Sequence, residues 1–145
     1  MRLLPRTRYG FQVMVELAMA HEEGAASLKT VTERADISAK YLEQVLALLR
    51  AGDLVRSVRG EHGGYVLGRS PADIHLSEIF AVLEGPLLSA ECLKHPKSTP
   101  QCPDCMTRHV WQALQTRMMT TLASRTLQDI VKMAKPPAKG RKPRR

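Results

Sequence analysis

The chain has 145 residues, enough for one ordinary domain whose hydrophobic core needs no disulfides. No apolar run approaches the roughly 20 residues that span a bilayer, and no signal-peptide pattern opens the chain, so we expect a cytoplasmic protein with no membrane contact. The net charge of +8 argues only weakly for nucleic acid, because six basic residues and no acid fall within residues 135–145. We expect this proline- and glycine-containing stretch to be a disordered basic tail.

Two helical patterns come first along the chain. Tyr9, Val13 and Leu17 recur at a spacing of about four residues and predict an opening helix. Ser27 can cap a second helix over residues 28–35, because a serine oxygen accepts from an amide that the first turn leaves unpaired.

A third helix is predicted after a turn of about three residues, with Ser38 as its cap. Its buried face would hold Leu42, Val45, Leu46 and Leu49. Its free face would hold Ala39, Lys40, Glu43, Gln44 and Ala47. Two helices joined in this way form a helix–turn–helix unit, whose second helix can enter a DNA major groove. An ordinary helical hairpin with a solvated polar face is the competing interpretation.

Two short β-prone runs, residues 54–58 and 65–67, flank a glycine-rich turn and predict a hairpin. A hairpin directly behind a recognition helix is the wing of a winged helix–turn–helix domain. Arg59 at the base of this wing could enter a minor groove, where the negative potential favours a guanidinium. The glycines would let the turn approach a phosphate backbone closely.

The second half of the chain is predicted to contain helices around a long loop. Ser77 can cap a fourth helix that ends at Gly85, and the aperiodic residues 87–105 would form a functional loop. A long helix reaching Arg125 and a short one starting at Thr126 would follow. The expected fold is mainly α with a small β-hairpin. Its parts are a winged helix–turn–helix domain (1–84), a cysteine-containing sensor loop (85–106), dimerisation helices (107–134) and the tail.

Three cysteines, Cys92, Cys102 and Cys105, lie close together in the predicted loop. In a chain without a secretion signal this clustering indicates metal or redox chemistry rather than a disulfide framework. The thiolates could hold an iron–sulfur cluster, a zinc ion together with one histidine, or a thiol switch between Cys102 and Cys105. A thiol oxidoreductase is a remote alternative, because no βαβ pattern surrounds the pair. No recognisable catalytic set or Walker loop is present, so we expect no enzyme.

Several of these segments occur together in a known family. They are Arg8-Tyr9-Gly10, Ile37-Ser38-x-x-Tyr41-Leu42-Glu43-Gln44, Gly52-x-Leu54-Val55, Ser57-Val58-Arg59-Gly60-x-x-Gly63-Gly64-Tyr65 and Cys105-x-Thr107 before Trp111. The combination resembles the Rrf-type winged-helix transcriptional regulators that include IscR, NsrR and CymR, over residues 1 to about 134. The resemblance implies a homodimer whose long C-terminal helices pair and whose recognition helices bind double-stranded operator DNA. Because members of this family repress transcription more often than they activate it, the resemblance favours a repressor.

The resemblance also assigns roles to residues. The residue matching Glu43 reads base edges, and the residue matching Arg59 enters the minor groove. The expected DNA-contacting set is Ser38, Lys40, Tyr41, Glu43, Gln44, Arg59, Gly60, His62 and Gly63. Members with cysteines in the loop hold an iron–sulfur cluster there and sense redox state, iron–sulfur status or nitric oxide. A 2Fe–2S cluster on the three cysteines is therefore favoured, with 4Fe–4S or zinc as alternatives.

A cluster held by one subunit needs a fourth ligand. In IscR this ligand is a histidine three residues after the last cysteine, where the present chain has Arg108, with His109 one step beyond. His109 is the first candidate, and the competing interpretation is a polar residue without a ligand role. Alternative ligands are Glu91, His95 and Asp104. A cluster-free member would respond through zinc, thiols, a small molecule or a protein partner.

Overall fold

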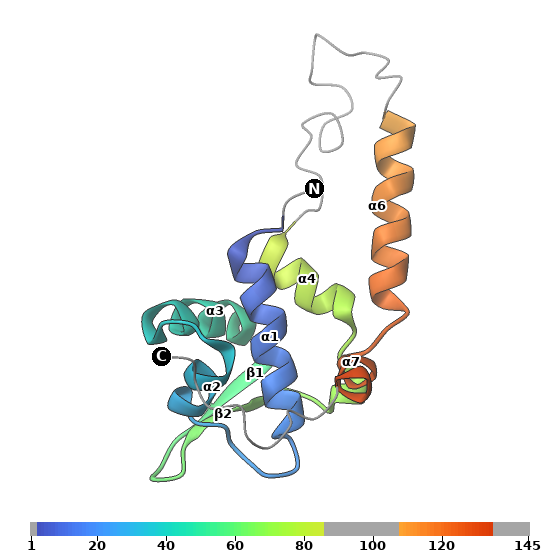
Figure 1. Cartoon of the computed structure of the whole chain (residues 1–145). Helices are drawn as coiled ribbons and strands as arrows, with labels where there is room; N and C mark the ends of the chain where they lie inside the picture. Colours follow the sequence, from blue (N-terminus) through green and yellow to red (C-terminus); the bar gives the residue numbers. More distant parts are fainter. Residues whose placement is uncertain (1–2, 86–107, 135–145) are drawn as a thin grey trace.

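The computed structural model describes residues 3–85 and 108–134 (Figure 1). The elements in chain order are α1 (Pro5–Met19), α2 (Leu28–Ala35), α3 (Ala39–Ala51), β1 (Val55–Val58), β2 (Gly64–Leu67), the 3₁₀ turn η1 (Pro71–Asp73), α4 (Leu76–Glu84), α6 (Arg108–Ala123) and α7 (Leu127–Met133). β1 and β2 pair antiparallel, which confirms the predicted mainly helical fold with one hairpin. Within the described ranges, no helix has the length and apolar character needed to cross a membrane.

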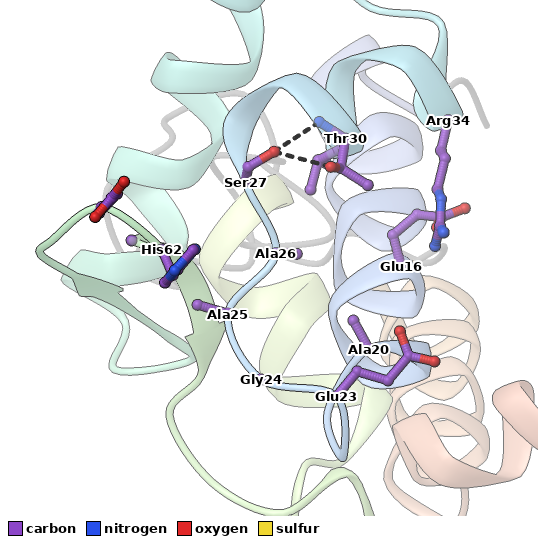
Figure 2. Close-up of a pocket in the computed structure, with 13 residues that line it drawn as sticks. Glu16, Ala20, Glu23, Gly24, Ala25, Ala26, Ser27, Thr30, Arg34 and His62 are labelled. Carbon is purple, nitrogen blue, oxygen red and sulfur yellow. Dashed lines mark hydrogen bonds and ion pairs between the residues drawn. The ribbon is translucent and has the colours of Figure 1, made fainter.

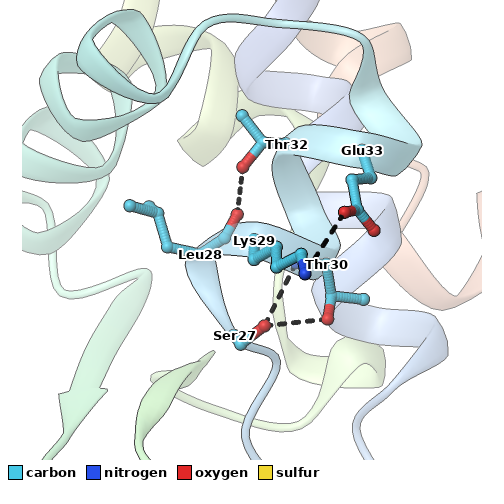
Figure 3. Close-up of polar contacts among 6 residues, drawn as sticks. All are labelled: Ser27, Leu28, Lys29, Thr30, Thr32 and Glu33. Carbon is cyan, nitrogen blue, oxygen red and sulfur yellow. Dashed lines mark hydrogen bonds and ion pairs between the residues drawn. The ribbon is translucent and has the colours of Figure 1, made fainter.

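Serine caps begin the two helices of the helix–turn–helix unit, as predicted. The Thr30 amide donates to Ser27 Oγ at 3.1 Å, and the Tyr41 amide donates to Ser38 Oγ at 3.3 Å. Figure 3 shows the start of α2, where the hydroxyls of Ser27 and Thr30 also lie 2.8 Å apart. Each cap satisfies an amide without an intrahelical partner, so local sequence alone determines where these helices start.

The prediction that Ser77 caps α4 is wrong, because the cap residue is His75 and the helix begins at Leu76. The amide of His75 donates to the carboxylate of Glu78 at 2.9 Å, so a glutamate inside the first turn supplies the cap. Residues 74–76 also hydrogen-bond to residues 125–127, with nitrogen–oxygen distances of 2.8 and 3.0 Å. This pairing fixes the backbone before α4, and the local sequence around Ser77 gives no sign of it.

Helices α1, α2, α3, α4 and α7 share one hydrophobic core. Leu17, Leu46, Leu83 and Leu127 are each at most 2% exposed and belong to this core. Leu127 lies in α7, so the short last helix packs on the N-terminal domain. In contrast, α6 buries none of its side chains and lies beside this domain, in contact with α4 (Figure 1).

Candidate nucleic-acid interface

Helix α3 has one buried face and one exposed face. Leu42, Val45, Leu46 and Leu49 are at most 1% exposed and anchor the helix in the core. The opposite face is exposed, as predicted, and carries Ala39, Lys40, Glu43, Gln44 and Ala47. Because the apolar face is fixed by packing, the polar face is presented on a rigid element. A recognition helix in a major groove requires this arrangement.

An aromatic contact holds the first turn of α3 against α1. The rings of Tyr41 and Tyr9 pack edge to face, with centroids 5.6 Å apart and planes at 78°. The Arg8 guanidinium lies over the Tyr9 ring, 4.8 Å from its centroid, and donates to the Tyr9 hydroxyl at 3.0 Å. Tyr41 therefore has a structural contact in addition to its predicted place at DNA. The sequence did not reveal this contact, because Tyr9 fitted the helical stripe of α1.

The wing is tied to the chain that leads into α2. Its turn, residues 59–62, is exposed, and Gly60 has a φ of 121°, a conformation that favours glycine. Ala26 and Tyr65 exchange two backbone hydrogen bonds of 2.9 and 3.0 Å. Gly64 lies against the backbone of Ala26 and Ser27, where a side chain would overlap. Gly64 is thus needed for packing inside the protein, a reason separate from the predicted approach to phosphates.

The predicted DNA-contacting residues fall on these two elements. Ser38, Lys40, Tyr41, Glu43 and Gln44 lie in α3 or at its cap, and Arg59, Gly60, His62 and Gly63 lie in the wing turn. All are exposed except Tyr41 and Gly63, which are half-buried. The backbone therefore presents both groups at the surface, on neighbouring elements joined through β1.

A polar pocket of about 360 Å³ lies between the wing, the end of α1 and the start of α2 (Figure 2). Arg34 and Glu16 form an ion pair of 3.3 Å on its wall, and Glu23, Glu61 and His62 also line it. Three carboxylates and one guanidinium line the pocket, a charge balance that disfavours phosphate. The residues that line this pocket come from separate segments, so no local pattern predicted it.

The predicted cysteine ligands, together with Glu91, His95 and Asp104, lie outside the described residues. His109 is exposed on the first turn of α6. Within residues 3–85 and 108–134, no group of three or more histidines, cysteines or acids is arranged to hold a metal. The metal hypothesis therefore depends on the cysteines of the sequence.

An apolar groove of about 500 Å³ separates α6 from α1 and α4. Phe11 and Phe80 line the wall formed by the domain, and Leu114, Met118 and Leu122 line the α6 wall. Leu114 is 48% exposed. Apolar surface of this kind is typical of an interaction site.

Comparison with known proteins agrees with this geometry. The model of the Rrf2 family, described as iron-dependent transcriptional regulator, matches residues 3–133. CymR of Bacillus subtilis is 38% identical over 130 residues, which cover 90% of this chain and 89% of CymR. The CymR structure matches with a TM-score of 0.79 and 35% identity, covering 93% of this chain and 99% of the other.

IscR proteins are similar as well. IscR of Xenorhabdus nematophila is 36% identical over 133 residues, covering 91% of this chain and 80% of that protein. The structure of T. potens IscR matches with a TM-score of 0.77 and 37% identity, covering 97% of this chain and 94% of the other. CymR and IscR are named as transcriptional regulators, in agreement with the expectation that the chain is not an enzyme. The chain belongs to the Rrf2 family and is a transcriptional regulator with a winged helix–turn–helix fold.

Proposed function

We propose that the protein acts in the cytoplasm as a homodimer that binds double-stranded operator DNA and represses transcription from it. In each subunit α3 occupies a major groove, and the wing lies over the adjacent minor groove. The observation that carries this proposal is the division of α3 into a buried apolar face and an exposed face with Lys40, Glu43 and Gln44. The helix–turn–helix regulators to which the chain is similar support it.

The exposed groups divide into those that select bases and those that hold the backbone. The carboxylate of Glu43 gains nothing from phosphates but can accept from cytosine N4, and the amide of Gln44 can pair with adenine. Lys40 and Ser38 can contact phosphates, which position the helix without reading sequence. Arg59 supplies a guanidinium for a narrow minor groove, while Gly60, His62 and Gly63 shape the turn around it.

Selection from a random duplex library tests the proposal directly. The purified protein, at roughly physiological salt, should enrich one sequence with two-fold symmetry, since a symmetric dimer reads two half-sites. A selected site without symmetry would contradict the dimer. A library that stays random would contradict sequence reading by α3.

The proposed dimer uses the apolar groove. The α6 helix of a second copy would cover Leu114 together with Val110 and Trp111, which are 63% and 43% exposed on the same helix. Pairing of two such helices would bury apolar side chains that one subunit leaves in water. The length of α6, Arg108–Ala123, suits a helix-to-helix interface.

For the sensor we propose an iron–sulfur cluster on Cys92, Cys102 and Cys105, with 2Fe–2S favoured over 4Fe–4S and His109 as the first candidate for the fourth ligand. Three thiolates are the donor set that such clusters use, and the description of the family as iron-dependent supports the choice. A bound cluster would supply a centre that responds to redox state, iron–sulfur status or nitric oxide. The exposed position of His109 leaves its imidazole free to take this role.

A cluster-free regulator is the second candidate, favoured by the similarity to CymR, which is named as the global cysteine regulator of B. subtilis. Zinc or a Cys102–Cys105 thiol switch would then take the place of the cluster. Protein purified without oxygen distinguishes the two. A visible absorption band with iron and sulfide, lost in Cys102→Ser but kept in Ser98→Ala, is expected for the cluster. A colourless protein after iron and sulfide are supplied supports the second candidate and contradicts the first.

A further inference from the structure

The N-terminal end of α1 and the C-terminal end of α4 meet at a polar contact, here called the α1–α4 juncture, formed by Arg6, Thr7, Leu83 and Glu84 (Figure 1). The hydroxyl of Thr7 donates to Glu84 Oε2, and the amide of Leu4 lies 3.4 Å from both carboxylate oxygens. In the other direction, Arg6 Nε donates to the Leu83 carbonyl at 2.6 Å. Each charged group thus lies at the helix end whose partial charge is opposite to its own.

Two of the four residues at this juncture are buried. Thr7 is 0% exposed, and so is Leu83. A buried hydroxyl loses considerable free energy when it is left without a partner, so the contact between Thr7 and Glu84 fixes the spacing of the two helix ends. One turn further along α1, Gly10 lies directly against the Leu83 side chain, where an added methyl group would overlap. The two helices therefore hold one relative position.

Helix α1 connects this juncture to the recognition helix. Tyr9, two residues after Thr7, packs edge to face on Tyr41 in the first turn of α3. The amide of Tyr41 in turn donates to the cap residue Ser38. Both Ser38 and Tyr41 belong to the end of α3 that carries the base-reading face. Glu84 is thus linked to Thr7 by a side-chain contact, Thr7 to Tyr9 by the backbone of α1, and Tyr9 to α3 by the contact with Tyr41.

We propose that the α1–α4 juncture is a positioning element for the recognition helix, in which Glu84 and Thr7 fix the first turn of α1 and Tyr9 carries that position to Tyr41. Neither Glu84 nor Thr7 would touch DNA. The inference deepens the proposed DNA-binding function. The affinity measurement below rests on that function, whereas the hydrogen-exchange measurement does not. A direct contact also exists at the other end of α3, where Val82 of α4 packs on Gly52, so the test must separate the two routes.

Hydrogen exchange of the DNA-free protein tests the first step. Glu84→Ala should speed exchange in the first turn of α1 by about tenfold, the change expected when a buried hydrogen bond to a charged group is lost. The amides of Tyr41 and Leu42 should also exchange faster. In Tyr9→Leu protein these two amides should no longer respond to Glu84→Ala, because the connecting ring is gone.

Two controls make the outcome decisive. Glu78→Ala removes another hydrogen-bonded carboxylate of the same helix, one that binds Arg69 at 2.6 Å at the far end of α4, and should leave Tyr41 and Leu42 unchanged. If Glu84→Ala does not fold, Thr7→Val, which replaces the hydroxyl with a methyl group, should give the same pattern, and Thr7→Ser, which keeps the hydroxyl, should behave like the parent. Unchanged exchange at Tyr41 and Leu42, or an equal effect of Glu78→Ala, would overturn the proposal.

The affinity for the duplex selected from the random library is the second readout. Glu84→Ala should weaken binding about fivefold to tenfold in parent protein and should have no further effect in Tyr9→Leu protein. Additive losses would mean that α4 acts through the Val82 contact and that the proposed route is wrong. Because exchange needs no DNA, a failure of DNA binding leaves the first test of the juncture intact.

Discussion

Helices α3 and α6 use their apolar residues in opposite ways. In α3 four large apolar residues, Leu42, Val45, Leu46 and Leu49, are packed against the rest of the same chain, and the polar face remains at the surface. In α6 no side chain is buried, and Val110, Trp111 and Leu114 lie at the surface beside an apolar groove. One helix is complete within the chain, whereas the other leaves apolar surface that a second copy would cover.

This difference indicates how folding and assembly are divided. Substitutions behind α3 should act on the folding of a single chain, whereas substitutions on the groove face of α6 should act on association. The two kinds of effect are separable, because only association depends on protein concentration.

The largest effect is expected for Leu114→Asp, which places a charge in the groove. It should convert the proposed dimer to monomers and weaken binding to the selected duplex by roughly 10²- to 10⁴-fold, the range that two linked binding sites supply. Sedimentation and DNA titration measure the two effects. Thr116→Asp, a matched change that points away from the groove residues, should leave both unchanged. A stable dimer in Leu114→Asp protein would contradict the proposal that a second copy covers the groove face of α6.

The next effect is on the core behind α3. Leu46 is 1% exposed, and Leu46→Ala should cost about 2–5 kcal/mol of the free energy of unfolding, because a buried cavity replaces the side chain. Denaturant unfolding at two protein concentrations measures this cost. The loss relative to the parent should be the same at both concentrations. A loss that grows on dilution would mean that α3, too, depends on a second copy.

A smaller effect is expected for Ser38→Ala, which removes the cap of α3 but leaves its buried face intact. Loss of an N-cap serine should cost about 1 kcal/mol of unfolding free energy. Ser70→Ala is the matched control and should cost less, because Ser70 caps the three-residue turn η1, whereas Ser38 caps a helix of 13 residues. Equal losses in thermal unfolding would show that the cap adds nothing specific to α3.

The smallest effect concerns α7, the helix that follows α6 but packs in the core. The amide and hydroxyl of Thr126 donate to Asp129 and hold the pKa of its carboxyl below the ordinary 3.8. Because folding lowers this pKa, the charged carboxylate stabilises the protein at pH values above the ordinary pKa of 3.8. This stabilisation is lost as the pH falls through the lower pKa of the folded state. Asp129→Asn should therefore lower Tm slightly at pH 7, and the difference from the parent should shrink below about pH 4. A difference independent of pH would exclude the capping carboxylate as its cause.

Local signals predicted much of this fold. The caps Ser27 and Ser38, the exposed face of α3 and the hairpin depend on residues close in sequence, and the structure agrees with each. The start of α4 was mispredicted, because the cap by Glu78 and the pairing with residues 125–127 set it together, and only the cap is local in sequence. The juncture of Thr7 with Glu84 was hidden for the same reason, since neither residue indicates a contact so far along the chain. Long-range contacts of this kind appear only once the chain is folded.

Base reading by α3 is tested most directly by a comparison of Glu43→Ala with Arg59→Ala. Each variant is titrated against the selected duplex and a scrambled duplex at several salt concentrations. Glu43→Ala should reduce the preference for the selected duplex by about tenfold, because a lost base contact removes discrimination and no phosphate contact. Arg59→Ala should weaken both duplexes and reduce the salt slope by about one. Equal losses on both duplexes for both variants would contradict base reading by α3.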